Sequence, residues 1–291
     1  MINKVLKIQE GSPDYPRRLE KLPGRPMELY VLGNLPREDI PTVAIVGARM
    51  STPYGRIQAF RFARELSKNG VQVISGLANG IDSEGHKGAL EGTTPTFAVM
   101  GNGVDICYPS QNRQLYERIW QNGGGIISEY PEGVSPKPYH FPIRNRIISG
   151  LADLVLVVEA RVKSGSLITA NYALEQGKTV YAIPGMVGEA LSEGCNKLIF
   201  DGAGIAYNIE VILSELGIFN QERKTDCKKK QISLARDMKL VYSCLDFCPK
   251  RADDCLEKTN LPIADINRIL MELNLMGLIR EVGRGYYIRE S

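Results

Sequence analysis

The sequence predicts an α/β protein, in which helices cover both faces of a parallel sheet, followed by a small C-terminal winged-helix domain. Between residues 42 and 219, continuous apolar runs alternate with amphipathic helical segments. Unbroken apolar runs are typical of parallel strands buried on both faces. A charged segment without apolar periodicity follows at 221–231. Beyond it, three helical patterns and a hairpin are typical of a winged helix.

The first 40 residues are Pro-rich and irregular, with one helical signal at 15–22, and are interpreted as a lead-in segment. The α/β domain is expected over 41–220. Its predicted strands are 42–47, 71–76, 94–101, 125–131, 154–160 and 179–185. Its predicted helices are 56–70, 81–92, 111–124, 144–153, 166–178 and 209–219. Gly70 supplies the helix-ending glycine of the first of them.

The tail is expected to form a basic linker over 221–234 and the winged-helix domain over 235–291. Its helical patterns cover 234–247, 251–259 and 262–278, and its hairpin turns at 283–285. The third pattern is acidic and apolar, with Arg268 as its only basic residue. Helices that read DNA grooves need basic or amide side chains. We therefore expect the tail to bind protein, a second copy included, more than duplex DNA.

Composition limits the functional classes. The 291 residues carry a net charge of +3 with a pI near 8.4, so any nucleic-acid site is expected to be a local patch. No apolar run approaches the roughly 20 residues of a membrane span, and the N-terminus shows no signal-peptide core. The six cysteines have irregular spacing. These features favour a cytoplasmic protein with reduced thiols.

Basic and aromatic residues gather around one predicted strand, in the segment 140–169. They lie before and after the apolar run 154–160, not along it. In a parallel α/β sheet such residues project from loops at the strand ends, where ligands bind. Positive charge beside an aromatic ring, with no evident nucleophile or catalytic acid, favours a phosphate-rich polymer as the ligand.

The segment 137–146 carries the strongest part of this signal. Phe141 offers a stacking face between Pro138 and Pro142, which we expect to stiffen an extended loop. Phosphate contacts are expected from Lys137, Arg144 and Arg146. Stacking combined with positive charge suits single-stranded nucleic acid, whose bases are exposed. The structural alternative is a helix-capping loop in which an arginine pairs with Glu129 or Glu159.

The turn after the first predicted strand places Gly47 and Arg49 before a helix. Such a helix N-terminus and its arginine can hold one phosphate, and a solvated arginine is the structural alternative. The turn is not GxGxxG, and the GxxxxGK[ST] phosphate loop occurs nowhere in the chain. We therefore expect no dinucleotide, ATP or other cofactor.

Other chemically active side chains are interpreted as structural. Asp82 and His86 lie in a glycine-rich segment but match no metal-ligand spacing. Cys107 has no histidine placed to activate it. Three cysteines of the tail lack CxxC pairs and nearby histidines: Cys244, Cys248 and Cys255. We expect these side chains to pack in cores, with neither a metal nor a nucleophile among them.

Six segments resemble, in order, the DNA-processing protein A family, called DprA or Smf. Residues 15–34 also resemble the family's segment before the first core strand, and the tail resembles the winged-helix domain of many members. The resemblance covers about 14–218. The six segments are VAIVGAR at 43–49, VISGLANGIDSEGHKGAL at 73–90, MGNGVDICYP at 100–109, GGGIISEYPEG at 123–133, FPIRNRIISGLAD at 141–153 and EARVKSGSLITANYALEQGKTVYAIPG at 159–185.

The resemblance implies an extended Rossmann-like core that binds single-stranded DNA and dimerises. It also implies protection of incoming DNA and help in loading the RecA recombinase during natural transformation, with single-strand-binding protein as a further partner. Members of the family are not known as enzymes, and the resemblance implies no enzymatic activity for this protein. Many members begin with a helical domain of the SAM type, for which 40 residues leave no room. The family's pocket implies these DNA-binding residues: Gly47, Arg49, Lys137, Phe141, Arg144, Asn145, Arg146, Lys163 and Ser164.

Two other functions are alternatives to this one. Nucleotide phosphoribohydrolases of a related Rossmann-like group use a PGGxGTxxE motif. The comparable segment here, KSGSLITANYALEQG at 163–177, lacks the double glycine after proline and the glutamate at the helix start. A winged-helix transcription regulator with an α/β sensor domain is the other alternative, and it rests on the tail alone.

Overall fold

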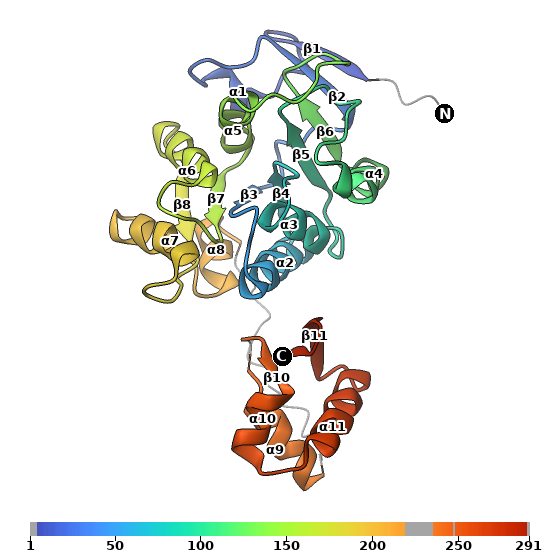
Figure 1. Ribbon diagram of the computed structural model, residues 1–291. Helices are drawn as coiled ribbons and strands as arrows, with labels where there is room; N and C mark the ends of the chain where they lie inside the picture. The colour runs from blue at the N-terminus through green and yellow to red at the C-terminus, as the bar shows by residue number, and fades with distance from the viewer. Residues whose placement is uncertain (1–4, 219–234, 247, 290–291) are drawn as a thin grey trace. The chain divides into compact units, whose positions relative to one another are not determined.

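The computed structural model describes residues 5–218, 235–246 and 248–289. The chain divides into two compact units, Met1–Phe219 (unit 1) and Asn220–Ser291 (unit 2), each with its own hydrophobic core (Figure 1). The predicted linker 221–234 lies outside the described residues.

Unit 1 is built on one mixed sheet with the strand order β1-β2-β6-β5-β4-β3-β7-β8-β9. Strands β3 to β9 are parallel, and β1 and β2 are antiparallel additions at one edge. All six predicted strands are present. The strands are β1 Leu6–Gln9, β2 Glu28–Gly33, β3 Thr42–Val46, β4 Gln72–Ser75, β5 Thr96–Met100, β6 Gly125–Ser128, β7 Leu154–Val157, β8 Thr179–Ala182 and β9 Gly204–Ile205.

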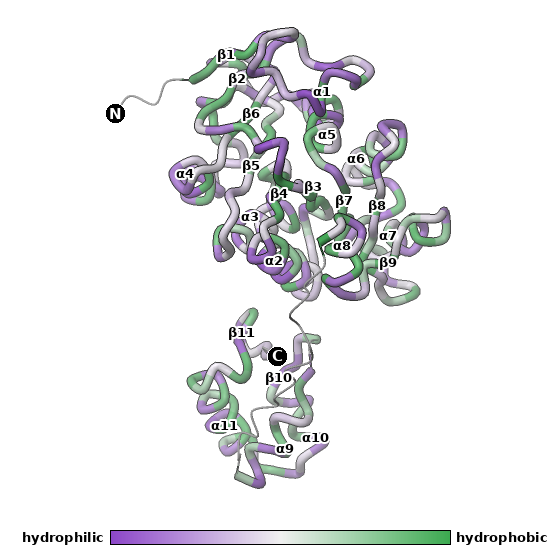
Figure 2. Tube along the Cα trace, turned by 180° about the vertical axis from the view of Figure 1, so that it is seen from behind, coloured by the Kyte–Doolittle hydropathy of each residue, from purple (hydrophilic) through white to green (hydrophobic). Residues whose placement is uncertain are grey.

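Helices cover both faces of this sheet, as the apolar runs predict. Along β3, Ala44 and Val46 pack in the core that includes residues of α1, α5, α6 and α7. Val43 and Ile45 pack on the opposite face with α2, α3 and α8. Figure 2 shows the apolar character of these central strands. The helices are α1 Arg17–Glu20, α2 Pro53–Lys68, α3 Ile81–Ala89, α4 Arg113–Gln121, α5 His140–Leu151, α6 Gly165–Glu175, α7 Ala190–Phe200 and α8 Ile209–Glu215.

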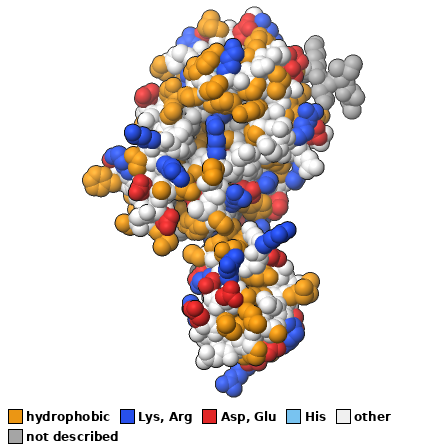
Figure 3. Space-filling view, in the orientation of Figure 1, with side chains coloured by type: hydrophobic (Ala, Val, Ile, Leu, Met, Phe, Trp, Pro, Cys, Tyr) orange, Lys and Arg blue, Asp and Glu red, His pale blue; other side chains and the backbone are white. Residues whose placement is uncertain are grey.

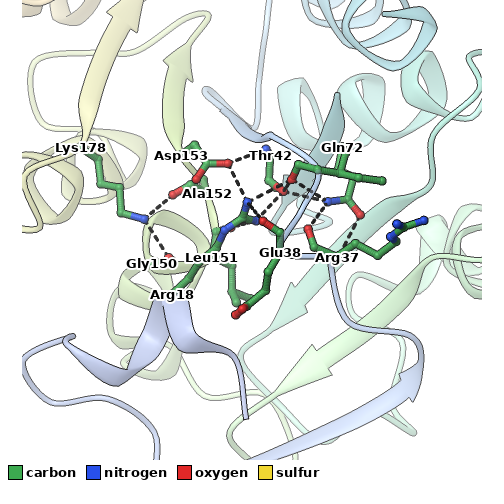
Figure 4. Close-up of polar contacts among 11 residues, drawn as sticks. Arg18, Arg37, Glu38, Thr42, Gln72, Gly150, Leu151, Ala152, Asp153 and Lys178 are labelled. Atoms are coloured by element: carbon green, nitrogen blue, oxygen red, sulfur yellow. Dashed lines mark hydrogen bonds and ion pairs between the residues drawn. The ribbon is translucent and has the colours of Figure 1, made fainter. Parts of the chain in front are cut away.

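The first 40 residues, which we interpreted as a lead-in segment, are part of unit 1. They contribute β1, α1 and β2 to unit 1, and β2 pairs antiparallel with β6. Leu29 and Val31 alternate with less buried residues along β2 and reach the core. Arg18 of α1 ties this segment to the sheet, since its guanidinium donates to Thr42 Oγ1 (2.8 Å) and pairs with Asp153 (Figure 4).

Helix α5 begins at His140, four residues before the predicted start at 144. Pro142 therefore lies in the first turn of the helix and not in an extended loop. Proline is tolerated there because first-turn N–H groups have no intrahelical acceptor. Helix α7 and strand β9 were not predicted. The earlier start of α5 brings Phe141 onto a rigid element.

Unit 2 contains the three predicted helices and the predicted hairpin. The helices are α9 Arg236–Cys244, α10 Ala252–Thr259 and α11 Ile263–Leu275. The strands β10 Lys250–Arg251, β11 Ile279–Gly283 and β12 Tyr286–Arg289 form a sheet of order β10-β12-β11. Cys255 is buried in its core and Cys244 packs against that core, as expected. Cys248 is exposed, so the expectation that it packs in a core was wrong. Among the described residues, no helix is long and apolar enough to cross a membrane.

Candidate nucleic-acid interface

A cavity of about 710 Å³ opens at the carboxyl ends of β3 and β7. In the sheet, β4 lies on one side of β3 and β7 lies on its other side. The strand order therefore reverses between β3 and β7. Such switch points are where ligands bind in open α/β sheets. The turn after β3, the first turns of α5 and the segment before α6 line this cavity. It brings together the predicted residues Gly47, Arg49, Phe141, Arg144, Asn145, Lys163 and Ser164.

An aromatic pair with an adjacent guanidinium forms one wall. The rings of Tyr108 and Phe141 are stacked with centroids 5.5 Å apart and an angle of 27°. The guanidinium carbon of Arg49 lies 5.6 Å from the centroid of Phe141. Arg49 is exposed, and no ion pair with a carboxylate is found for it among the described residues. This wall therefore offers a stacking face and a positive charge within reach of one nucleotide.

Another part of the cavity lining carries positive charge near a helix N-terminus. Arg161 and Lys163 are exposed in the loop between β7 and α6. Ser164 caps α6, and its hydroxyl accepts from Ser166 N (3.3 Å). The first turn of α6 contains no acidic residue. Cationic side chains beside a helix N-terminus favour an anion such as a phosphate group.

Arg144 forms the floor of the cavity. Its side chain is buried and donates to the carbonyl oxygens of Gly76 (3.1 Å) and Val99, and to Asn145 Oδ1 (3.2 Å). Burial lowers the pKa of Arg144 to about 10, while nearby Asp82 acts in the other direction. Burial raises the pKa of Asp82, whose carboxylate accepts from the backbone N–H of Gly76 (3.1 Å). Arg144 thus holds the loop after β4 beneath the cavity.

Two predicted residues lie outside the residues that line the cavity. Arg146 makes a two-pronged ion pair with Glu129 (2.7 and 2.8 Å) and donates to Gly24 O (2.7 Å). This is the ion pair with Glu129 that the sequence offered as the structural alternative. Lys137 is exposed, with its ammonium 5.9 Å from the ring centroid of Tyr139.

Tyr108 and Arg161 line the cavity and were missing from the predicted set. Arg161 lies two residues before Lys163 in the segment that the sequence singled out, so its basic character was a readable signal. Tyr108 carries no such signal, because it precedes Pro109 in a segment far from Phe141 in sequence. Only the folded chain shows that the two rings stack.

His86 has the structural role that was expected. It is fully buried, and its Nδ1 lies 2.8 Å from Thr96 Oγ1, which itself donates to Val73 O. Burial, with a smaller contribution from Arg144, lowers the pKa of His86 to about 3. The imidazole is therefore neutral. Across the described parts of the chain, no group of three or more His, Cys, Asp or Glu side chains is arranged to hold a metal ion.

These features define a Rossmann-like α/β protein that carries a basic, aromatic cavity and a winged-helix unit. The chain belongs to the family described as DNA recombination-mediator protein A, whose family profile matches residues 7–217. A second profile, the DprA winged helix domain, matches residues 228–283.

Relatives match most of the chain. Protein Smf of Synechocystis is 36% identical over 97% of this chain and 80% of its own length. The DNA processing protein DprA of Streptococcus pneumoniae is 41% identical over 69% of this chain and 71% of its own length. The X-ray structure of that protein covers 73% of this chain and 74% of its own, with a TM-score of 0.69 and 39% identity. A DprA structure from Helicobacter pylori, described as showing a single-stranded DNA binding mode, has a TM-score of 0.66 at 32% identity, covering 73% of this chain and 95% of its own.

Proposed function

We propose that this protein binds single-stranded DNA in the cavity of unit 1 and acts as a recombination mediator by binding, without catalysis. The observation that carries the proposal is the stacked pair Tyr108 and Phe141 with Arg49 beside it, at the strand-order switch point. The Helicobacter pylori relative, whose structure is described by its single-stranded DNA binding mode, supports the same ligand class.

The chemistry of the cavity favours single strands over duplex. A base can stack on Phe141 only when it is not already paired within a duplex, and stacking tolerates any base because each has a π-face. Phosphates would be held by Arg49, and by Arg161, Lys163 and the α6 N-terminus in another part of the lining. On the face of unit 1 seen in Figure 3, Lys and Arg side chains are scattered among apolar and uncharged ones. This distribution favours a local site over a broad basic surface.

Fluorescence anisotropy with single-stranded and duplex oligonucleotides of equal length tests the proposal. We expect tighter binding of the single strand, little sequence preference, and a log–log salt slope of about −0.7 for each phosphate contact. Arg49→Ala should weaken binding by about 10- to 100-fold, as expected for a charged hydrogen bond. The control is Lys21→Ala, an exposed lysine at the end of α1. Equal or tighter binding of duplex would contradict the proposal and favour the transcription-regulator alternative.

We also propose partners for this protein. We infer that the bound single strand is protected and passed to the RecA recombinase during natural transformation, in the cytoplasm, with single-strand-binding protein as a competitor for the same strand. The match to a recombination-mediator family supports this inference. The test is RecA strand exchange on strands coated with single-strand-binding protein. Wild-type protein should accelerate it and Arg49→Ala should not.

A homodimer is the assembly we propose. Strand β9 is the edge of the sheet, and apolar side chains are exposed on it and around it: Phe200 (89% exposed), Ile205 and Tyr207. Exposed apolar patches beside an edge strand are typical of association surfaces. Light scattering after size-exclusion chromatography should show a dimer for wild type and a monomer for Phe200→Asp. A dimer that persists in Phe200→Asp would place the interface elsewhere.

The hydrolase alternative has a direct assay. Glu175, the nearest counterpart of a catalytic glutamate, lies in the last turn of α6 and outside the residues that line the cavity. We expect no release of free base from nucleoside monophosphates. Release that is abolished by Glu175→Gln would revive the enzyme interpretation.

A further inference from the structure

An exposed aromatic ring at the start of α5, two residues before Phe141, is not among the residues that line the cavity. Tyr139 is the N-cap residue of α5 and is 59% exposed. Helical residues two positions apart do not face each other. Phe141 lines the cavity and Tyr139 does not, whereas Pro138, between Lys137 and Tyr139 in the chain, does line it. Tyr139 therefore follows a cavity-lining residue in the chain without lining the cavity itself.

The Tyr139 ring packs against a fixed aromatic neighbour. It meets the ring of His140 edge-on, with centroids 4.7 Å apart and an angle of 86°. His140 is buried, stacks on Tyr130 at 4.0 Å, and is fixed by a hydrogen bond between its Nδ1 and Gly101 O (2.8 Å). An aromatic side chain held in this way loses little conformational entropy when a ligand binds to it.

The loop before Tyr139 is also anchored. The N–H of Gly133 donates to both carboxylate oxygens of Asp105 (3.0 Å), and the N–H of Gly103 donates to Val134 O (2.9 Å). The N–H of His140 donates to Lys137 O (3.0 Å), which fixes the turn that enters the helix. Tyr139 and Lys137 are thus presented by an ordered segment.

Positive charge lies on both sides of this ring. The ammonium of Lys137 is 5.9 Å from the Tyr139 centroid. Helix α5 has twelve residues, no side-chain cap and no acidic residue in its first turn. A phosphate between a base on Phe141 and a base on Tyr139 would face the positive end of this helix. Ring, cation and helix terminus together repeat the stacking-plus-charge chemistry of the cavity wall.

We propose that Tyr139 and Lys137 form a second stacking subsite for single-stranded nucleic acid, reached over Pro138 by the strand that leaves the cavity. This inference rests on the proposed function, and it defines the direction of the strand across the start of α5. One base stacks on the Phe141 side and a later base stacks on Tyr139. Lys137 holds the phosphate next to the second base.

Oligothymidylates of two lengths test the subsite, one of about 4 nucleotides and one of about 16, spanning the range of single-strand sites. Tyr139→Ala should weaken binding of the long strand by about 5- to 100-fold, the usual loss of one stacked base, and leave the short strand unchanged. Tyr139→Phe should retain wild-type affinity, because the ring remains. Lys137→Ala should make the salt slope for the long strand shallower by about 0.7. Lys21→Ala is the charge control, and thermal melting of each variant checks that α5 remains folded.

The outcomes separate this inference from the proposed function. If Phe141→Ala weakens binding of both strands while Tyr139→Ala weakens neither, the cavity is the site and the subsite is rejected. If Tyr139→Ala weakens both strands equally, Tyr139 acts within the cavity, which also rejects a second subsite. If Tyr139→Ala binds both strands like wild type but loses RecA stimulation, the ring contacts protein and not nucleic acid. If wild-type protein binds no single strands, both proposals fail.

Discussion

Arg49 and Arg146 were both predicted as DNA contacts, but they differ in what contacts their guanidinium groups. Arg49 is exposed and lies against the face of Phe141. The Arg146 side chain is only 13% exposed and is gripped by Glu129, whose side chain is 15% exposed. An arginine whose donors already have acceptors has little left for a phosphate. We therefore expect Arg49 to act in ligand binding and Arg146 in stability.

We expect Arg146→Ala to lower the free energy of unfolding by roughly 2–4 kcal/mol, because Glu129 would keep a mostly buried carboxylate without its partner. Urea denaturation measures the loss. Glu129→Gln and the double variant complete a cycle in which the two losses should not add. A stable Arg146→Ala protein with weakened DNA binding would instead restore Arg146 to the binding residues.

His86 predicts a pH dependence of stability. The pKa of the folded imidazole is lowered to about 3 by burial, whereas the unfolded chain has a pKa near 6.5. The unfolded state therefore binds the proton more readily between these values. The His86 contribution is complete above about pH 6.5 and falls by about 1.4 kcal/mol per pH unit below it.

Urea unfolding of wild type and His86→Gln at pH 7 and pH 5 isolates this contribution. The wild type should lose more stability than the variant, since glutamine does not titrate. Asp82, whose pKa is raised by burial, contributes in the opposite direction in both proteins. Equal losses in the two proteins would show that His86 is not held neutral.

At the scale of elements, α5 connects the cavity to the opposite end of the sheet. Its first turn carries Phe141, and its last carbonyls are bound by two cations. Arg18 donates to Leu151 O (3.2 Å), and Lys178 donates to Gly150 O (3.0 Å) and Ala152 O (Figure 4). Cations at a helix C-terminus are favourable. The N-terminal segment thus helps to fix the helix that presents the stacking ring.

Arg18→Ala should lower the free energy of unfolding by roughly 1–3 kcal/mol, because it removes the side-chain donor to Leu151 O and the ion pair with Asp153. The neighbouring Arg17 is the matched control. Its side chain is 86% exposed, so Arg17→Ala should change stability by less than about 0.5 kcal/mol. Chemical denaturation measures the free energy of unfolding of both variants. Similar losses in the two would contradict a stabilising role for Arg18.

The elements that the sequence predicted well are those with continuous apolar runs. Strand β7 and its neighbours are recognisable because burial on both faces leaves no polar position. Helix α7 and strand β9 were not predicted, because most of the segment 184–205 is not part of a continuous apolar run. The start of α5 was misplaced because Pro138 and Pro142 suggest an extended loop. In the cavity, seven of the nine predicted site residues lie in the lining, but most of the other lining residues and the burial of Arg144 were not predicted. Its acceptors, Gly76 O and Val99 O, come from distant strands.

At the scale of the whole molecule, each of the two units has hydrophobic packing of its own. The cores of unit 1 are closed by its own helices, with Ile212 and Leu213 of α8 buried against the sheet. Unit 2 buries Ile266, Leu270 and its neighbours in a core of its own. Neither core borrows a described residue from the other unit. The site and its supporting contacts all lie in unit 1.

A chain ending at Gln221 should therefore fold and keep most of its affinity for single strands. On α11, the sole basic residue, Arg268, is engaged by Glu272 (2.8 Å) and lies near Asp265, while Met271 and Leu275 are exposed. This surface suits a protein partner better than a DNA groove.

Lysines 228–230 lie outside the described residues. From sequence they should add only a non-specific contribution that disappears at high salt. Affinities of residues 1–221 and 1–291 for one oligonucleotide, compared at high salt, should agree within tenfold. A larger loss, above about 1.4 kcal/mol, would make unit 2 part of the DNA site.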